Sequence, residues 1–424
     1  EFARKMSGKP VFSGIVCELN PLHRGHAYLL QEARRHSDAV VCVMSGNWVQ
    51  RGEPAVLSKF VRARMALACG ADLVAELPLP WACAGAEPFA FGAVSLLDSL
   101  GCIGQLWFGS ECGDAERLNR LASLLLSPAF SNALRDCLQT GKSFAAARQQ
   151  AVTQLAGSEE AALLESANNI LGIEYCKALH RLQSPITPMT VKRMGSPHDS
   201  RQEATPDAFL SASQLRELLR EGQSLEGLLP PAAWQILQEE ISAGRAPGDF
   251  SRLETAVIAR LRSMSKAEFA ALPDVSEGLE NRLYEVSRRA LTLEALYEGV
   301  KSKRYSHARI RRIVAAAFLG IPRNLPAKPP YFRVLAMNAR GREVLRAASQ
   351  KATIPLLSRP RDFLQGPEEP RSLFALEQRA TDLFALTLPA PPACGWDCRQ
   401  GVLALSSVDP AENGEAERVS KENR

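Results

Sequence analysis

The sequence predicts an α/β fold in which a parallel sheet occupies the first half of the chain and a mainly helical region follows. Up to about residue 193, short apolar runs alternate with segments of helical periodicity, which is typical of parallel strands joined by crossover helices. From about Ser211 onward, apolar residues recur mainly with the helical period. The chain has 424 residues, enough for two or three domains.

The apolar runs place the strands of a Rossmann-like sheet at Val11–Cys17, Ala39–Met44, Ala71–Leu77, Gly104–Gly109 and Pro188–Arg193. The run Ala39–Met44 is continuously apolar, as expected for a strand covered on both faces. Helices are expected between the strands, at His26–His36, Ala55–Cys69, Phe89–Leu100, Leu118–Leu126 and Ser131–Leu155. Each strand except the last two is thus followed by one crossover helix.

In the second half, helices are expected at Gln214–Arg220, Ala232–Ser242, Leu253–Ser263, Leu279–Tyr297 and Ser306–Leu319. Tyr331–Met337 and Thr353–Leu357 are expected to form a small pair of strands around a helix at Arg340–Ser349. The segment Arg359–Arg371 is rich in proline and charge, which predicts an irregular connection. We therefore expect one domain over residues 11–220, a mainly helical domain over 221–405, and a disordered polar tail over 406–424.

Composition narrows the class of protein. Hydrophobic residues make up 46% of the chain, and no apolar run approaches the roughly 20 residues of a membrane span. The N-terminus lacks the apolar core of a signal peptide. The net charge of +5 permits an anionic partner. None of the ten cysteines forms a Cys-x-x-Cys pair, and even Cys394 and Cys398 have no histidine nearby, so we expect reduced thiols, no metal site and a cytoplasmic location.

Two histidines mark the most informative stretch, Gly14-Ile-Val-Cys-Glu-Leu-Asn-Pro-Leu-His-Arg-Gly-His26. A strand ends, the chain turns, and a helix opens, so His23 and His26 are expected on one side of a helix start beside free backbone N–H groups. Such a site binds anions and can hold a phosphate during in-line displacement. Gly25 allows a close approach. The pattern alone leaves open that both are surface loop histidines.

Asn20-Pro-Leu-His-Arg-Gly-His26 resembles the His-x-Gly-His signature of the nucleotidyltransferase superfamily. Four later blocks narrow the resemblance: Met44-Ser-Gly-Asn-Trp-Val-Gln-Arg-Gly-Glu-Pro-Ala55, Gly70-Ala-Asp-Leu-Val-Ala-Glu-Leu-Pro78, Phe108-Gly-Ser-Glu111 and Asn168-Asn-Ile-Leu-Gly-Ile-Glu-Tyr175. The set is similar to the bacterial tRNA(Met) cytidine acetate ligase family, over about residues 11 to 340. In that family ATP activates acetate as acetyl-adenylate, and the acetyl group passes to the wobble cytidine of elongator tRNA(Met), giving N4-acetylcytidine.

The resemblance implies a set of site residues. His23 and His26 would be catalytic, and the superfamily's Ser-Ser-Thr-x-x-Arg signature is matched by Leu210-Ser-Ala-Ser-Gln-Leu-Arg216, whose serines and arginine would hold the leaving pyrophosphate. The residues implied to bind ATP are Val16, Cys17, Glu18, Leu19, Asn20, Pro21, Leu22, His23, Arg24, Gly25, His26, Ala27, Tyr28, Leu29, Gly109, Asn168, Arg193, Ser211, Ser213 and Arg216. The family usually has an aromatic residue in place of Leu19, Phe in place of Leu22 and often Asn in place of Arg24.

Physical reasoning agrees with these positions but leaves alternatives. Ligands of open parallel sheets bind at the carboxyl ends of strands, where most of these residues are predicted. Asn168 can read adenine or ribose, or it can cap a helix. Arg193 can bind phosphate in bidentate fashion, or it can be a solvated charge at a strand end. Ser211 and Arg216 can equally belong to an ordinary capped helix.

The polar loop Ser45–Glu53 follows the second predicted strand, where a second substrate is expected. Asn47, Gln50 and Arg51 are candidates to orient acetate or cytidine. Lys59 and Arg62 follow at helical spacing; they can face phosphate or RNA, or form a solvated helix face. No serine, cysteine or threonine has a recognisable base partner, so the sequence does not indicate an acetyl-enzyme intermediate.

The segment 301–312 is strongly basic and contains no acidic residue. Ser306 is expected to cap a helix whose apolar stripe runs through Ile310, Val314 and Phe318. Arg309 and Arg312 would share a face away from that stripe, in a different domain from the ATP site. We expect the segment to bind tRNA, with a solvated basic face as the alternative. The residues proposed for tRNA contact are Lys301, Lys303, Arg304, Tyr305, Arg309, Arg311 and Arg312.

The sequence therefore favours an ATP-dependent tRNA cytidine acetate ligase, with acetate and elongator tRNA(Met) as partners and no membrane contact. Magnesium is left open as an aid to the first step, and the oligomeric state is not predicted. Two alternatives remain at this point: an adenylyltransferase acting on a small metabolite, and a non-catalytic nucleotide-dependent RNA-binding protein. The basic segment argues against the first alternative, and the intact histidine pair argues against the second.

Overall fold

The structure is a computed structural model that describes residues 10–193, 210–276, 278–302 and 305–405. Within these ranges, one sheet of eight strands forms the centre of the molecule, in the order β10-β8-β5-β2-β1-β6-β7 with β9 paired to β8. The predicted tail at 406–424 lies outside the described residues. In the described part of the chain, no helix is long and apolar enough to cross a membrane.

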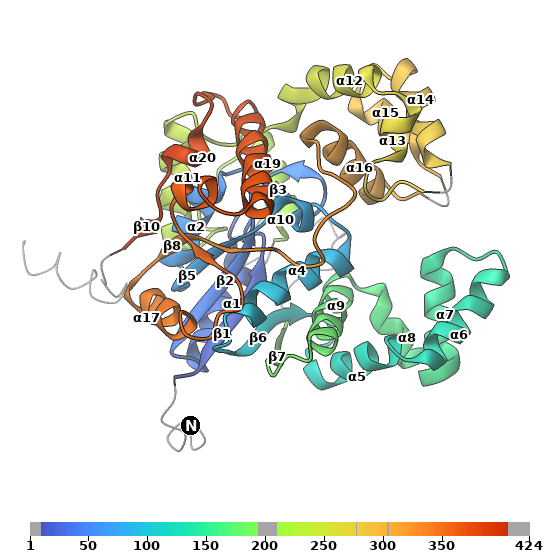
Figure 1. The fold of residues 1–424 in the computed structure, drawn as a ribbon, viewed down its shortest axis with the longest axis horizontal. Helices are drawn as coiled ribbons and strands as arrows, with labels where there is room; N and C mark the ends of the chain where they lie inside the picture. The colour runs from blue at the N-terminus through green and yellow to red at the C-terminus, as the bar shows by residue number, and fades with distance from the viewer. Residues whose placement is uncertain (1–9, 194–209, 277, 303–304, 406–424) are drawn as a thin grey trace, which may run out of the picture.

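Five parallel strands form the predicted part of the sheet (Figure 1). They are β1 (Phe12–Cys17), β2 (Ala39–Ser45), β5 (Leu73–Leu77), β6 (Ile103–Ser110) and β7 (Thr187–Lys192). All five sequence-based strand predictions are therefore confirmed to within two residues at each end. Successive residues of β2 enter opposite apolar clusters: Val41 and Val43 pack on one face, and Val40, Cys42 and Met44 on the other. This explains why the strand is apolar without alternation.

Helices cover both faces of the sheet. One face packs against α1 (Arg24–Arg35), α2 (Lys59–Ala68), α10 (Ala212–Arg220) and α11 (Pro231–Ser242). The other packs against α4 (Ala86–Ser99), α5 (Ala115–Leu125) and α9 (Ala167–Leu182). A short α3 (Leu79–Ala82) precedes α4. The result is a three-layer α/β architecture, as the fold class requires.

The helix predicted from Ala55 begins later, at Lys59, because Ser58 is its N-cap and residues 55–57 connect it to a hairpin. Strands β3 (Trp48–Val49) and β4 (Glu53–Pro54) pair antiparallel, and Ser58 caps α2 by accepting from the Val61 N–H. The helix predicted over Ser131–Leu155 is two helices, α6 (Pro128–Gln139) and α7 (Phe144–Ala156). Gly141 has a φ of 78° between them, and Ser143 caps the second. The turn therefore interrupts a continuous helical pattern.

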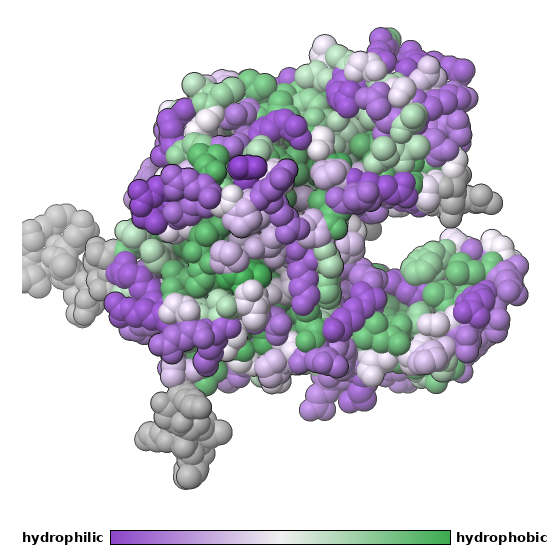
Figure 2. Space-filling model, viewed as in Figure 1, coloured by the Kyte–Doolittle hydropathy of each residue, from purple (hydrophilic) through white to green (hydrophobic). Residues whose placement is uncertain are grey.

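The helices α6 and α7, with α8 (Ser158–Ala162) and the 3-10 turn η2 (Leu163–Glu165), form a lobe that projects from the sheet beside α5 and α9 (Figure 1). Figure 2 shows hydrophobic surface on this lobe within an otherwise mixed face of the molecule. Its exposed apolar side chains include Leu138, Phe144 and Leu155.

A group of helices forms a second projecting region: α12 (Glu254–Ser263), α13 (Lys266–Ala270), α14 (Leu279–Arg289), α15 (Leu293–Val300) and α16 (His307–Leu319), with η3 (Phe250–Leu253) before them. The helix predicted over Leu279–Tyr297 is divided, because Thr292 begins α15 as an N-cap. The apolar stripe of α16 is confirmed: Ile310 and Val314 are fully buried, and Phe318 packs against the Trp48 ring.

The last part of the chain returns to the central sheet. Strand β8 (Phe332–Met337) pairs antiparallel with β5, and β9 (Leu356–Leu357) and β10 (Leu403–Ala404) pair parallel with β8. The helix α17 (Ala339–Ala348) separates β8 from β9. The predicted pair of strands around a helix is thus present, and it extends the first sheet. Residues within 221–405 therefore share a core with residues 11–220.

The prediction of an irregular connection over Arg359–Arg371 is wrong. This stretch contains α18 (Pro360–Leu364) and the start of α19 (Glu368–Ala385), and α20 (Trp396–Arg399) follows. Pro360 occupies the first turn of α18, where its missing N–H costs no helical hydrogen bond. Glu368 and Glu369 fall in the first turn of α19, where their charge favours the helix N-terminus. In this segment, proline and acidic residues therefore occur in the first turns of α18 and α19.

Candidate active site

A cavity of about 520 Å³ opens at the carboxyl ends of β1, β6 and β7. The loop after β1, the first turns of α1, and the starts of α9 and α10 form its walls. Most of the residues predicted to bind ATP line it: Val16, Cys17, Glu18, Leu19, Asn20, His23, Arg24, Gly25, His26, Tyr28, Leu29, Gly109, Asn168, Arg193, Ser213 and Arg216. Pro21, Leu22, Ala27 and Ser211 are not among the lining residues.

His23 and His26 begin α1 as a reciprocal cap. His23 Nδ1 accepts from the backbone N–H groups of Gly25 at 3.1 Å and His26 at 3.4 Å. His26 Nδ1 in turn accepts from the His23 N–H at 3.3 Å. The two rings stack with centroids 3.7 Å apart. A Cβ on Gly25 would lie 3.0 Å from the His23 ring, so the glycine leaves room for this arrangement.

The hydrogen bonds assign the tautomer of both rings. A neutral imidazole has one donor and one acceptor nitrogen, so rings that accept at Nδ1 carry their proton on Nε2. Burial and the positive charge of Arg193 lower the pKa of His26 to about 3. Burial, then the neighbouring His26, lowers the pKa of His23 well below its ordinary value. Both side chains are thus neutral Nε2–H donors lining the cavity.

This arrangement corrects one sequence expectation. The sequence predicts that the backbone N–H groups of Gly25 and His26 are free for an anion, but they already donate to His23 Nδ1. Each imidazole still carries an Nε2–H donor in the cavity wall. Most of the residues predicted to bind ATP thus line one cavity, while these two backbone donors are used within the helix cap.

Asn168 and Arg193 meet at the edge of the cavity. Arg193 follows β7 directly, and its Nη1 donates to Asn168 Oδ1 at 3.2 Å. The Asn168 amide nitrogen donates to Glu111 Oε1 at 2.7 Å, and Glu111 Oε2 also accepts from the Asn169 N–H at 2.7 Å. Glu111 therefore caps α9, and Asn168 is not the cap. Sequence reasoning assigned Glu111 no function, although it belongs to the block Phe108–Glu111.

The segment Leu210–Arg216 has features of both interpretations, an ordinary capped helix and a ligand-binding motif. Ser211 is the N-cap of α10 in a capping box with Gln214, as an ordinary helix start requires. Ser213 and Arg216 line the cavity, and Arg216 Nη1 donates to the Asn20 carbonyl at 2.9 Å. The motif is thus both a helix cap and a part of the cavity wall.

Two of the three candidates for the second substrate reach the cavity. Gln50 and Arg51 line it, and the Gln50 N–H donates to Glu18 Oε1 at 2.8 Å. Asn47 does not line the cavity. It is 3% exposed, its Oδ1 accepts from the Lys59 N–H at 2.7 Å, and its Nδ2 donates to Thr381 at 3.1 Å. The structure therefore gives Asn47 a place in the core.

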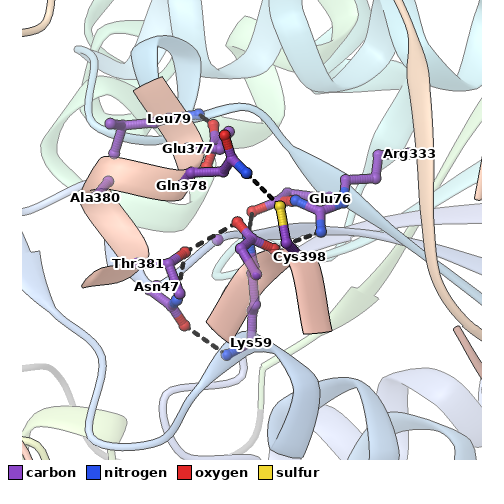
Figure 3. Close-up of polar contacts among 12 residues, drawn as sticks. Asn47, Lys59, Glu76, Leu79, Arg333, Glu377, Gln378, Ala380, Thr381 and Cys398 are labelled. Atoms are coloured by element: carbon purple, nitrogen blue, oxygen red, sulfur yellow. Dashed lines mark hydrogen bonds and ion pairs between the residues drawn. The ribbon is translucent and has the colours of Figure 1, made fainter. Parts of the chain in front are cut away.

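Lys59 and Arg62 fit neither interpretation offered by the sequence, because both are 0% exposed. Lys59 Nζ contacts Glu76 at 2.7 Å and Asp397 at 2.9 Å (Figure 3 shows Lys59 with Glu76). The Arg62 guanidinium donates to the carbonyls of Leu57, Glu18 and Gly46. Arg62 thus ties the loop after β1 to the loop after β2, and burial lowers its pKa to about 10.

Lys59 belongs to a buried charge cluster that joins distant parts of the chain (Figure 3). Arg333 of β8 pairs with Glu76 of β5 and Asp397 of α20. Burial, then the neighbouring Glu76 carboxylate, raises the pKa of Glu377 well above its usual value. With Glu377 in its neutral form, Lys59 and Arg333 face Glu76 and Asp397, and the charges balance. We call Lys59, Glu76, Arg333, Glu377 and Asp397 the buried charge cluster.

The basic helix α16 lies closer to the cavity than expected. Ala308 and Arg312 line the same cavity as the histidines. Arg312 Nε donates to Asp274 Oδ2 at 3.2 Å, and Arg309 Nε donates to the Asp274 carbonyl at 3.0 Å. Arg312 thus lines the cavity although it belongs to the part of the chain predicted to form a separate domain.

The other residues of the basic segment have varied surroundings. Lys301 is exposed, whereas Tyr305 is 7% exposed and lies against the Arg309 guanidinium. Arg311 pairs with Glu53 at 2.7 Å and lies over the Tyr297 ring. Lys303 and Arg304 lie outside the described residues. Tyr305 is thus not free to stack on a base.

All ten cysteines are free thiols. Within the described ranges, no group of three or more histidine, cysteine, aspartate or glutamate side chains is arranged to hold a metal ion. Acidic side chains are rare around the cavity itself: of its described lining residues, only Glu18 carries a carboxylate. Its cationic lining residues are Arg24, Arg51, Lys192, Arg193, Arg216 and Arg312. Such an excess of positive charge suits a polyanionic ligand.

The parallel sheet, the histidine cap and the cationic cavity define a nucleotidyl transferase. Residues 11–394 match the family described as HIGH Nucleotidyl Transferase. A tRNA(Met) cytidine acetate ligase from Acetivibrio thermocellus is 37% identical over 414 residues, which cover 92% of this chain and 99% of that protein. Another, from Thermoanaerobacter sp. strain X514, is 38% identical over 395 residues, covering 91% and 97%. The chain belongs to the tRNA(Met) cytidine acetate ligase family.

Solved structures agree with the family. The apo crystal structure of Thermotoga maritima TmcAL has a TM-score of 0.88 and 32% identity, covering 94% of this chain and all of that one. The crystal structure of Thermotoga maritima TmcAL bound with alpha-thio ATP has a TM-score of 0.86 and 33% identity, with the same 94% of this chain covered. The predicted fold class is thereby confirmed.

Proposed function

We propose that the chain activates acetate with ATP and transfers the acetyl group to the wobble cytidine of elongator tRNA(Met), forming N4-acetylcytidine. The observation that carries the proposal is the pair of neutral imidazoles that present Nε2–H donors to a cavity rich in arginine. Family membership favours this activity over a metabolite adenylyltransferase or a non-catalytic RNA-binding protein. Because the substrate is tRNA, we propose a cytoplasmic location.

In the first step, an acetate oxygen attacks the α-phosphorus of ATP, and the bond to pyrophosphate breaks. His23 and His26 are proposed to donate to the α-phosphate oxygens through Nε2, where charge accumulates. Neutral imidazoles suit this position, because each donates its Nε2–H without having to bind a second proton at pH 7. Ser213 and Arg216 are proposed to hold the leaving pyrophosphate. Gly109, Asn168 and Arg193, which also line the cavity, are proposed to hold the nucleoside.

Magnesium would enter with the nucleotide, bound to its phosphates. The described lining residues offer only the Glu18 carboxylate as an acidic ligand, so the residues present fit a nucleotide-borne ion better than a site built by the protein. The charge that the metal neutralises lies on the β- and γ-phosphates.

In the second step, the exocyclic amine of cytidine attacks the acetyl carbonyl, and AMP leaves. Gln50 and Arg51 line the cavity at the end of β2 and are proposed to orient acetate and then the cytidine. Lys301, Arg309 and Arg312 are proposed to contact the tRNA backbone, with Arg312 at the junction of the cavity and α16. We propose that residues 11–220 bind ATP and that residues 221–405 bind tRNA. The division is one of function and not of separate cores, because β8 and β10 of the second part join the sheet of the first.

Two assays test this function. Acetate-dependent exchange between ATP and labelled pyrophosphate measures the first step, and mass spectrometry of elongator tRNA(Met) after reaction measures the second. We expect exchange that requires acetate, and an acetyl mass increment at one cytidine of the anticodon loop. Exchange without acetate, or a modified small molecule in place of tRNA, would contradict the proposal.

A further inference from the structure

The acetyl transfer needs a group that takes a proton. When the exocyclic amine of cytidine attacks a carbonyl, its nitrogen becomes positively charged and must lose a proton before the product amide forms. General bases that take such protons contribute about 10²–10⁴-fold to rate. The cavity must therefore provide an acceptor, or leave the proton to water.

The two histidines are unsuited to this task. His23 Nδ1 and His26 Nδ1 already accept backbone N–H groups, and the Nε2 atoms carry protons. The cavity's arginines and Lys192 are donors only. Cys17 donates its thiol proton to the Val43 carbonyl at 3.8 Å. Among the described lining residues, the single carboxylate, Glu18, is left.

Glu18 lies in the wall of the cavity. It is the first residue after β1, five positions before His23, and its partly exposed side chain lines the cavity. The Gln50 N–H holds Oε1 at 2.8 Å, which fixes the carboxylate beside the loop proposed to orient the second substrate. The Arg62 guanidinium holds the Glu18 carbonyl at 2.5 Å. Both ends of the residue are thus fixed.

The surroundings of the Glu18 carboxyl raise its pKa, which suits a general base. Burial raises the pKa of Glu18, while the Gln50 N–H and the charges of Arg216, Arg62 and Arg51 oppose that rise. A raised pKa makes a carboxylate a stronger base near neutral pH. Two buried groups near it are uncharged: burial raises the pKa of Tyr175 and of Cys83 well above their usual values. His23 and His26 are neutral, as derived above.

We propose that the Glu18 carboxylate is the general base of acetyl transfer. The amine lone pair forms the new N–C bond at the acetyl carbon, and the carbonyl electrons move to oxygen. Glu18 accepts the proton from the amine nitrogen. The tetrahedral intermediate then collapses, the C–O bond to the phosphate breaks, and its electron pair leaves with AMP. Glu18 afterwards releases the proton to solvent. The inference rests on the proposed function, because it assigns the base of its second step.

The competing explanation is that Glu18 only positions the Gln50 loop. E18Q separates the two, because a glutamine carbonyl oxygen still accepts from the Gln50 N–H but has almost no basicity. A positioning residue would tolerate this exchange, whereas a general base would not. Glu268→Gln is the matched control: it makes the same chemical change to a carboxylate that also accepts a backbone N–H, that of Ser265 at 2.8 Å, and that does not line the cavity.

The measurement starts from enzyme with acetyl-adenylate already formed, and follows a single turnover onto elongator tRNA(Met). We expect E18Q to slow transfer about 10²–10⁴-fold, and to affect acetate-dependent pyrophosphate exchange far less. E18Q transferring within a few-fold of wild type would overturn the proposal, and so would an equal loss in both steps. Wild-type protein without acetate-dependent exchange would refute the proposed function instead, which keeps the two failures distinguishable.

The pH dependence gives a second readout that positioning would not move. In wild type, the single-turnover transfer rate should rise as pH increases through the pKa of Glu18 and then level off, because the carboxylate is the active form. In E18Q this rise should be absent. An identical rise in both proteins would assign it to another group and overturn the inference.

Discussion

Two groups of charged residues lie at the carboxyl ends of the same sheet, and they differ in how their charges are compensated. In the buried charge cluster, Lys59 and Arg333 pair with Glu76 and Asp397, and all four side chains are 5% exposed or less. In the cavity, six cationic side chains surround one carboxylate, Glu18.

The paired charges of the buried charge cluster stabilise the fold, whereas the cationic side chains of the cavity favour an anionic ligand. Buried ions are tolerated when paired, and the cluster needs no further partner. Its members come from α2, β5, β8, α19 and α20, so it holds the end of the chain onto the catalytic sheet. The cavity lining instead has more cationic than anionic side chains, which favours the binding of a polyanion.

The largest effect is expected in the buried charge cluster. K59M should lower the free energy of unfolding by about 3–5 kcal/mol, because it leaves Glu76 and Asp397 facing only Arg333. Urea unfolding followed by circular dichroism measures the change.

Two further variants sharpen this result. K328M makes the same chemical change at an exposed loop residue and should leave stability within about 0.5 kcal/mol. K59M/D397N restores the balance of charge, so it should be more stable than K59M alone. If K59M unfolds like wild type, the cluster does not support the fold as described.

The next largest effect is expected at the histidine pair. H23A and H26A each remove an Nε2–H donor aimed at developing charge, which is worth about 10²–10³-fold in rate. Acetate-dependent pyrophosphate exchange should fall by that amount, while the affinity for tRNA is kept. H36A, at the exposed far end of α1, should retain exchange. Near-normal exchange in both cavity variants would mean that the donors lie elsewhere.

An acid-induced loss of stability should follow from the same two residues. The folded state holds His26 neutral with a pKa of about 3, whereas the unfolded chain has the ordinary value of 6.5. Below pH 6.5 the unfolded chain therefore binds a proton at His26 that the folded chain does not bind. As the pH is lowered from 6.5 towards 3, the free energy of unfolding should fall by up to about 1.4 kcal/mol per pH unit.

Urea unfolding at pH 7 and pH 5 measures this slope. H26Q should reduce the slope, because glutamine does not titrate, while H36Q should leave it in place. An unchanged slope in H26Q would assign the acid sensitivity to other groups.

Most of the residues that the sequence predicts for the site line one cavity, because the signals that single them out are local. The strand endings, the spacing of His23 and His26 and the serine–arginine motif are all read from neighbouring residues. These signals therefore indicate which loops meet at the carboxyl edge of the sheet. What local reasoning missed was the identity of the donor atoms, because a side chain that caps its own helix competes with an external anion.

Long-range pairing could not be predicted in this way. Lys59 and Arg62 have the helical spacing of a solvated face, and only Asp397 and the loop carbonyls, distant in sequence, explain their burial. Likewise β8 crosses back to pair with β5, more than 250 residues earlier in the chain. Arg312 reaches the cavity for the same reason: α16 packs against β4, where Glu53 pairs with Arg311.

The smallest expected effect concerns α16, where Arg312 lines the cavity and Arg309 does not. Removing one phosphate-binding cation should reduce the slope of log affinity against log salt by about 0.7–0.9, so R309E and R312E should each weaken tRNA binding and flatten its salt dependence. Filter binding at several salt concentrations measures both quantities. R346E, on the exposed face of α17, provides the matched charge reversal and should leave the slope unchanged.

The two α16 variants should then diverge in the first step. Arg312 lines the cavity with His23, so R312E brings a carboxylate toward the bound triphosphate and should lower acetate-dependent exchange. Arg309 does not line the cavity and donates to Asp274 and Ser276, so R309E should lower exchange less than R312E does. Equal exchange in the two variants, with normal melting curves, would contradict the placement of Arg312 at the junction of the two sites. If the salt dependence of tRNA binding is unchanged in both variants, Arg309 and Arg312 do not contact the tRNA backbone and form a solvated basic face.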